Sequence, residues 1–187
     1  MTLRVEAEPD GGRAIVHAAL GRRAYRSDHL QSLQGAPQTA AALPLYVLSE
    51  EALSSEHPVA LARRAGWRYP IVGGAEPGLA LLSHRDGGHV YAGIIHGVLP
   101  RRLLEASAFA EDALGESQEP FAARLLEVPT RLLSCLWLAG PEDHFISLLG
   151  GSPPGTAPLK LSDDLRPLLG AIKRARVRRP PEGGPGI

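Results

Sequence analysis

The longest region in which apolar residues dominate is 121–149, FAARLLEVPTRLLSCLWLAGPEDHFISLL. It contains two apolar runs, RLLSCLWL at 131–138 and HFISLL at 144–149, with AGPED between them. Glycine and proline break regular structure, and a connection of about three to five residues suits antiparallel strands. These runs therefore predict a β-hairpin. A short helix beginning at Pro129 is the competing interpretation, and a proline there marks a strand start, an edge or a bend.

The same region carries a resemblance. An apolar segment, then Val128-Pro129, then a run closing in Leu136-Trp137-Leu138, then a short turn and a second apolar strand resembles the C-terminal halves of an uncharacterised protein family of GC-rich bacteria. The resemblance covers residues from about 66 to 149. It implies a small globular bacterial domain and brings no activity, ligand or catalytic residue with it.

A second hairpin is predicted where GLALLSH (78–84) and HVYAGII (89–95) flank RDGG, since Asp-Gly favours tight hairpin turns. Pro100 is expected to open a helix that runs to about Leu114. Alternating residues 2–8 predict a strand, with 13–20 returning as its partner, although the alanines of 13–20 also suit a short helix. Further expected elements are a strand at 43–48, a helix from 58 to 65, an extended segment at 67–72 and a last helix capped by 162–164.

Two hairpins around one helix, with further strands ahead and a helix behind, predict the α+β class. The expected architecture is an antiparallel sheet built from hairpins and covered by helices. We expect a single domain over 1–172, followed by a basic and then Pro/Gly-rich flexible tail over 173–187.

The composition argues against several classes of protein. Twenty basic and twenty acidic residues balance, so the chain has no bulk field to attract nucleic acid or membrane. Cys135 is the single cysteine, so no internal disulfide forms. Residues 1–20 lack the apolar block of a secretory signal, and no window approaches the roughly eighteen apolar residues of a membrane span. We expect a cytoplasmic protein without membrane association.

A metal site is one hypothesis for the turn of the second hairpin. If the strands pair, the rings of His84 and His89 approach each other, with Asp86 nearby as a third ligand. The alternative is that these residues are the solvent-exposed end of a hairpin.

Ligand binding or catalysis through His96 is a second hypothesis, because strand ends often carry binding and catalytic groups. Tyr91 and Trp137 would assist it. A buried histidine bonded to a neighbouring carbonyl is the alternative. Cys135 lies in the most apolar run and is expected to be core.

A third hypothesis concerns five basic residues within 173–179: Lys173, Arg174, Arg176, Arg178 and Arg179. Three roles are open for them. They would contact nucleic acid or another anion, be stabilised as cations by the negative end of a helix, or form a solvated tail. No aromatic residue for stacking on single strands follows Phe145.

The sequence favours a non-catalytic protein-interaction or structural domain that forms a homo-oligomer or binds another protein. It contains no set of residues that a known reaction requires, and it predicts no cofactor. A ligand-binding or enzymatic domain using His96, and an anion or nucleic-acid contact through the arginine cluster, are the alternatives.

Overall fold

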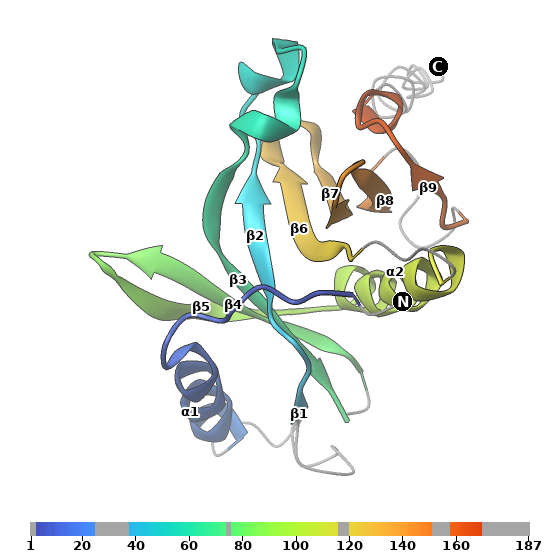
Figure 1. Ribbon diagram of the computed structural model, residues 1–187. Coiled ribbons are helices and arrows are strands. Elements are labelled where there is room, and N and C mark those ends of the chain that lie inside the picture. Colours follow the sequence, from blue (N-terminus) through green and yellow to red (C-terminus); the bar gives the residue numbers. More distant parts are fainter. Residues whose placement is uncertain (1–2, 25–37, 74–75, 116–119, 151–157, 170–187) are drawn as a thin grey trace, which may run out of the picture.

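The computed structural model describes residues 3–24, 38–73, 76–115, 120–150 and 158–169. The strands in this part of the chain are β1 (Gln38–Thr39), β2 (Leu43–Val47), β3 (Arg63–Val72), β4 (Gly78–Arg85), β5 (Gly88–His96), β6 (Ala122–Val128), β7 (Leu133–Ala139), β8 (His144–Leu149) and β9 (Leu161–Ser162). They form one sheet in the order β5-β4-β3-β2-β6-β7-β8-β9, and β1 pairs with β3. The α+β prediction is confirmed: a mostly antiparallel sheet built largely from hairpins, with helices packed on it (Figure 1).

Both predicted hairpins are present. In the first, β7 and β8 pair with Leu136 opposite Ile146 and Trp137 opposite Phe145. Pro129 belongs to a single 3₁₀ turn, η4 (Pro129–Arg131), which separates β6 from β7. The strand interpretation is therefore right for β7, and the helical alternative is limited to that one turn.

In the second hairpin, β4 and β5 are joined by Asp86 and Gly87, which have φ of 50° and 78°. Positive φ at both central residues is the geometry of a type I′ turn, whose twist matches that of the flanking strands. The Asp-Gly pair predicted this turn correctly.

The parallel pair β2–β6 joins the two halves of the sheet. Leu45 lies opposite Leu125 and Tyr46 opposite Leu126, while every other pair of described strands is antiparallel. On one side of this pair lie β3, β4 and β5, and on the other lie β7, β8 and β9. Residues far apart in the sequence therefore form the centre of the sheet.

Helix α2 (Val98–Ala113) covers one face of the sheet. Its start lies near Pro100, as predicted, and it ends just before Gly115. Its buried residues Leu99, Leu103, Ala106 and Ala110 pack into the same core as apolar residues of β2, β4, β6, β7 and β8. The sequence predicts an apolar face of Leu103, Leu104, Ala108, Phe109 and Leu114. Only Leu103 of this set is buried, Phe109 and Leu114 are partly buried against the core, and Ala108 is exposed, so the buried side of the helix is centred on Ala106 and Ala110 instead.

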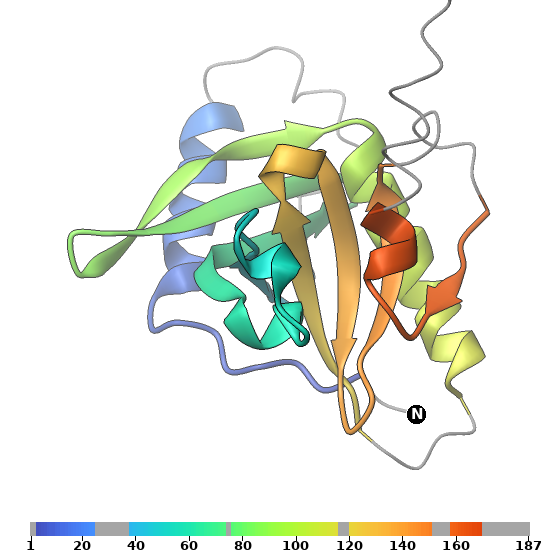
Figure 2. The same ribbon diagram turned by 90° about the horizontal axis from the view of Figure 1, so that it is seen from above.

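Helix α1 (Gly12–Ala24) covers the other face, beside β4 and β5 (Figure 1 and Figure 2). Val16 packs there with Trp67 and Tyr69 of β3. The predicted hairpin of 2–8 with 13–20 is therefore wrong, and the helical alternative for 13–20 is correct. Helical spacing buries Val16 and Ala19 on one side of α1, whereas residues 3–8 pair only at Arg4 with Ala122.

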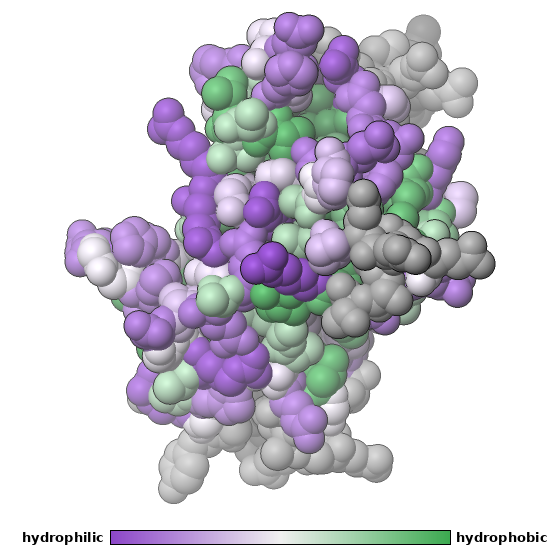
Figure 3. Space-filling model, in the orientation of Figure 1, coloured by the Kyte–Doolittle hydropathy of each residue, from purple (hydrophilic) through white to green (hydrophobic). Residues whose placement is uncertain are grey.

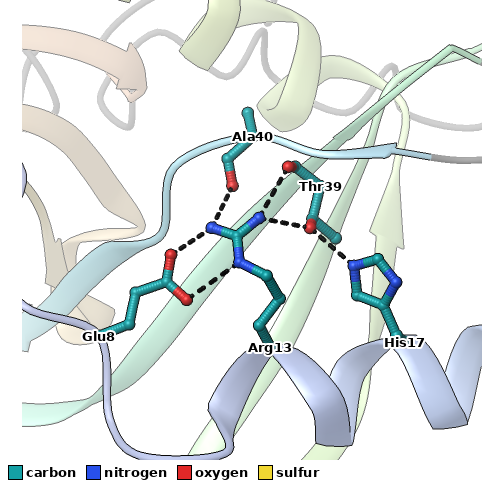
Figure 4. A network of polar contacts seen from close by, with 5 residues as sticks. All are labelled: Glu8, Arg13, His17, Thr39 and Ala40. Atoms are coloured by element: carbon teal, nitrogen blue, oxygen red, sulfur yellow. Dashed lines mark hydrogen bonds and ion pairs between the residues drawn. The ribbon is translucent and has the colours of Figure 1, made fainter.

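Arg13 fixes α1 to the sheet (Figure 4). Its guanidinium donates to the carbonyl oxygen of Thr39 at 3.0 Å, to Thr39 Oγ1 at 2.8 Å and to the carbonyl oxygen of Ala40 at 3.4 Å. Glu8 forms an ion pair with the same guanidinium. His17 Nε2 lies 3.0 Å from Thr39 Oγ1. These contacts hold the first turns of α1 against β1.

Two further predictions need adjustment. The helix expected at 58–65 is only the 3₁₀ turn η3 (Pro58–Leu61), because the chain enters β3 at Arg63 and makes ladder hydrogen bonds there. A second 3₁₀ turn, η2 (Ala52–Ser54), follows Ser49, whose Oγ accepts from the N–H of Ala52 at 3.3 Å. The last predicted helix is present at 166–169, and its continuation lies outside the described residues.

The helices within the described ranges are all too short or too polar to cross a membrane.

Candidate functional site

A pocket lies on the face of the sheet opposite α2, and we take it as the candidate functional site. Neighbouring residues of a strand point to opposite faces, so β6 directs Leu125 toward α2 and Arg124 into the pocket. Tyr46 of β2, Trp137 of β7 and Phe145 of β8 also line this cavity, which has a volume of about 690 Å³. Residues of η3 form one side and residues 163–166 form another; they are the teal and orange-red turns at the top of Figure 1.

The floor of the pocket combines aromatic rings with a guanidinium. The Tyr46 and Trp137 rings meet edge to face with their centroids 5.3 Å apart, and the Phe145 ring stacks 6.4 Å from Trp137. The guanidinium carbon of Arg124 lies 4.6 Å from the Trp137 ring centroid and 5.1 Å from that of Tyr46. These distances allow cation–π attraction to both rings. The rings of this face therefore already hold one cation of the chain itself.

Glu6 orients Arg124. Its Oε1 accepts from Arg124 Nε at 2.6 Å, and its Oε2 accepts from Arg64 at 3.0 Å. The segment that carries Glu6 is anchored by the Arg4 N–H, which donates to the Phe121 carbonyl at 2.8 Å. The N-terminal segment thus supplies the counter-ion for the arginine of the pocket floor.

Carboxylates surround the pocket. The Asp143 carboxylate accepts from the indole Nε1 of Trp137 at 2.9 Å, and Asp163 Oδ1 lies 2.8 Å from His144 Nδ1. The other lining carboxylates are those of Glu56 and Asp164. Figure 3 shows that hydrophilic side chains predominate on the face seen there, with apolar patches between them. The pocket therefore has an aromatic floor and an acidic border.

The predicted metal ligands form the tip of the β4–β5 hairpin. His84 and His89 lie directly opposite each other, with ring centroids 5.2 Å apart, as their pairing predicted. Asp86 occupies the turn and lies within ion-pair distance of Arg85, at 3.7 Å. Within the described ranges, no group of three His, Cys, Asp or Glu residues could hold a metal ion.

The predicted ligand-binding residues do not lie together. Tyr91 and His96 belong to β5, and four strands separate β5 from Trp137 on β7. His96 is exposed at the strand end, opposite Gly78. The Tyr91 hydroxyl is buried without a hydrogen-bond partner in the described part of the chain. Trp137 lines the pocket, whereas a binding role of His96 stays a prediction.

Cys135 is fully buried in the core beneath the pocket, and burial raises the pKa of its thiol. This environment keeps the sulfur protonated and out of reach of reagents. The basic cluster lies outside the described residues. Its contact with an anion or with nucleic acid stays a prediction.

Strand β5 forms an open edge of the sheet. Among the residues with described positions, only β4 pairs with it. The strand contains no Asp, Glu, Lys, Arg or Pro, and Val90 is 40% exposed. Its hairpin projects from the rest of the molecule, at the left of Figure 1. An edge strand presents unpaired N–H and C=O groups to which another strand can bind.

Sequence reasoning missed most of the pocket because its residues come from distant segments. Arg124 and the carboxylate that orients it, Glu6, are 118 residues apart, for example. One signal was present: Arg124 is a lone charge within the apolar run FAARLL. A charged residue inside an apolar strand is costly to bury unless it has a charged or hydrogen-bonding partner, so it indicates an ion pair or a binding site.

Together these features define a small α+β domain with an aromatic, acid-bordered pocket and an uncharged edge strand. Comparison with known proteins found no matching family model, no matching curated protein and no matching solved structure. The resemblance over residues 66–149 stays a prediction.

Proposed function

We propose that the protein is a non-catalytic interaction domain that self-associates by pairing the β5 strands of two copies. The observation that carries this proposal is the β5 edge, which has no charged residue and which no described strand except β4 pairs with. Natural sheets usually block an exposed edge with lysine, proline, a β-bulge or a covering segment. β5 has neither of these residues over its length from Gly88 to His96.

The side chains along β5 also favour self-association. Val90 is 40% exposed, and Ile94 and Ile95 are each only partly buried against separate parts of the core. A second strand would cover apolar area on both faces of the edge, and burial of such area stabilises association. Antiparallel pairing of β5 with its own copy satisfies two-fold symmetry, the commonest arrangement of homo-oligomers.

The edge has one irregularity that defines where pairing occurs. The register of β5 with β4 shifts at Ala92, which has no partner residue opposite it. Such a bulge bends and twists its strand. The bulge divides the edge into a segment around Val90 and a segment around Ile94 and Ile95. The β5 strand of a second copy would form an unbroken hydrogen-bond ladder with one of these two segments.

The test is the molar mass in solution, measured by light scattering during size-exclusion chromatography over a range of protein concentrations. We expect a mass above that of the monomer. The double variant Val90→Lys/Ala92→Lys should be monomeric, because lysines on an edge oppose pairing. Both positions are exposed, so the fold should persist, as circular dichroism can verify.

The matched control is Leu61→Lys, which places one lysine at a 52% exposed leucine outside the edge. It should leave the molar mass unchanged. A monomeric wild-type protein at every concentration would show that the β5 edge does not mediate self-association. A double variant with the wild-type mass would show that the segment around Val90 does not, and the double variant Ile94→Lys/Ile95→Lys then tests the other segment.

A further inference from the structure

We infer that the pocket binds an extended basic segment of another protein. This inference does not rest on self-association, because the pocket lies over β2, β6, β7 and β8, away from the β5 edge. It rests on the unbalanced charge of the lining, on the aromatic floor and on the spacing of the carboxylates.

The charge balance of the pocket is negative. Its two arginines already have carboxylate partners: Arg124 pairs with Glu6 at 2.6 Å, and Arg166 pairs with Asp164 at 3.4 Å. Three lining carboxylates, those of Glu56, Asp143 and Asp163, form no ion pair with a lysine or arginine of the described chain. A cationic occupant would supply the missing charges.

The floor suits the side chains of arginine and lysine. Tyr46 is partly exposed and, with the exposed edge of the otherwise buried Trp137, offers apolar surface for the methylene stems of these residues, whose charged heads would remain at the acidic border; Phe145 is only 2% exposed and supports the floor from beneath. Arg124 shows that the rings here accept a guanidinium, since it lies within about 5 Å of two of them. The pocket thus combines the two contacts that a basic side chain requires.

The spacing of the carboxylates does not suit one bound metal ion. Glu56 precedes η3, Asp143 lies in the β7–β8 connection and Asp163 follows β9. In the described residues, no three acidic groups are close enough together to hold one metal ion. Carboxylates dispersed around a cavity of about 690 Å³ instead suit several cationic groups carried on one backbone. A basic peptide segment has this form.

The probe is a fluorescently labelled peptide, AIKRARVRRP, which is the basic run at 171–180 of this sequence. Its binding to the full chain is measured by fluorescence anisotropy at low and high salt. We expect binding that weakens as salt rises, because the charges of the pocket border are partly exposed. A peptide with glutamine at every Lys and Arg should not bind.

The decisive variant is Glu56→Gln/Asp143→Asn/Asp163→Asn, which removes the three lining carboxylates that pair with no lysine or arginine of the described chain. We expect about tenfold weaker binding, since exposed ion pairs each contribute modestly and their effects combine. The matched control, Asp10→Asn/Glu111→Gln/Asp112→Asn, changes the net charge equally at exposed residues that do not line the pocket. It should bind as the wild type does.

Equal affinity of the two triple variants would mean that the peptide responds only to net charge, and it would overturn the inference. Failure of the peptide to bind at low salt would do the same. A full-chain variant with Gln at all five bases of 173–179 identifies the source of the ligand. Higher affinity for the peptide would show that the chain's own basic run competes for the pocket, and unchanged affinity would favour a separate partner.

Discussion

The two hairpins of the sheet are built alike but differ in their surroundings. In β7, six of seven residues are buried, and the hairpin has β6 on one side and β9 on the other. In β5, no residue is fully buried, and the strand ends the sheet. A central strand contacts neighbours on both faces and therefore reads as a continuous apolar run. In both hairpins the turn sequence predicts the hairpin itself. Whether the hairpin lies at the centre or at the edge of the sheet follows instead from how apolar its strands are on both faces.

Thiol reactivity should separate the two hairpins most strongly. Cys135 of β7 is fully buried and its pKa is raised by burial, so it should react with Ellman's reagent only when the core opens. Introducing Val90→Cys places a second thiol on β5, which should react at once. We expect Cys135 to react roughly 10⁴-fold more slowly, as for a group exposed only by global unfolding. Two thiols of similar rate in the native protein would contradict the buried position of β7.

Truncation of side chains should show the next largest difference. Leu136→Ala in β7 removes a fully buried side chain and should lower the free energy of unfolding by about 2–5 kcal/mol. Val90→Ala in β5 removes a partly exposed one and should cost less than about 1 kcal/mol. Urea unfolding of both variants measures the two values. Equal losses would mean that the Val90 side chain contributes as much to stability as the buried Leu136 side chain does.

The turns should show the smallest difference. Gly87 has φ of 78°, and an added Cβ would meet no atom within 4 Å. Gly87→Ala therefore tests backbone strain alone and should cost about 1–2 kcal/mol. Pro141→Ala in the exposed β7–β8 connection should change the free energy of unfolding by less than about 0.5 kcal/mol. Thermal unfolding compares the two, and a larger loss at Pro141 would show that this turn, too, depends on its backbone geometry.

The hairpins and α2 could be predicted because their signals are local. Asp86-Gly87 fixes a tight turn, and the apolar residues of α2 recur at helical spacing. Residues 13–20 show the limit of such signals, since their pattern is compatible with a strand or a helix. The packing of Val16 against Trp67 and Tyr69 decides between them.

The pocket could not be predicted because its contacts connect segments that no local pattern links. Tyr46 reaches Trp137 through the parallel pairing of β2 with β6 and the antiparallel pairing of β6 with β7. The sequence names Trp137 as a candidate and Arg124 stands out as a lone charge in an apolar run, while Asp143 and Asp163 give little local signal. Their roles arise from the order of strands in the sheet.

The parallel pairing of β2 with β6 also bears on how the protein folds. The hairpins β4–β5 and β7–β8 each close short loops, whereas joining Tyr46 to Leu126 closes a loop of about 80 residues. Contacts of such high sequence separation slow folding, since chain entropy is lost before the contacts form. The β3–β5 and β6–β8 halves can therefore assemble early and independently. The pairing of β2 with β6 is then the slow step, and it completes the sheet that separates the α2-side core from the pocket.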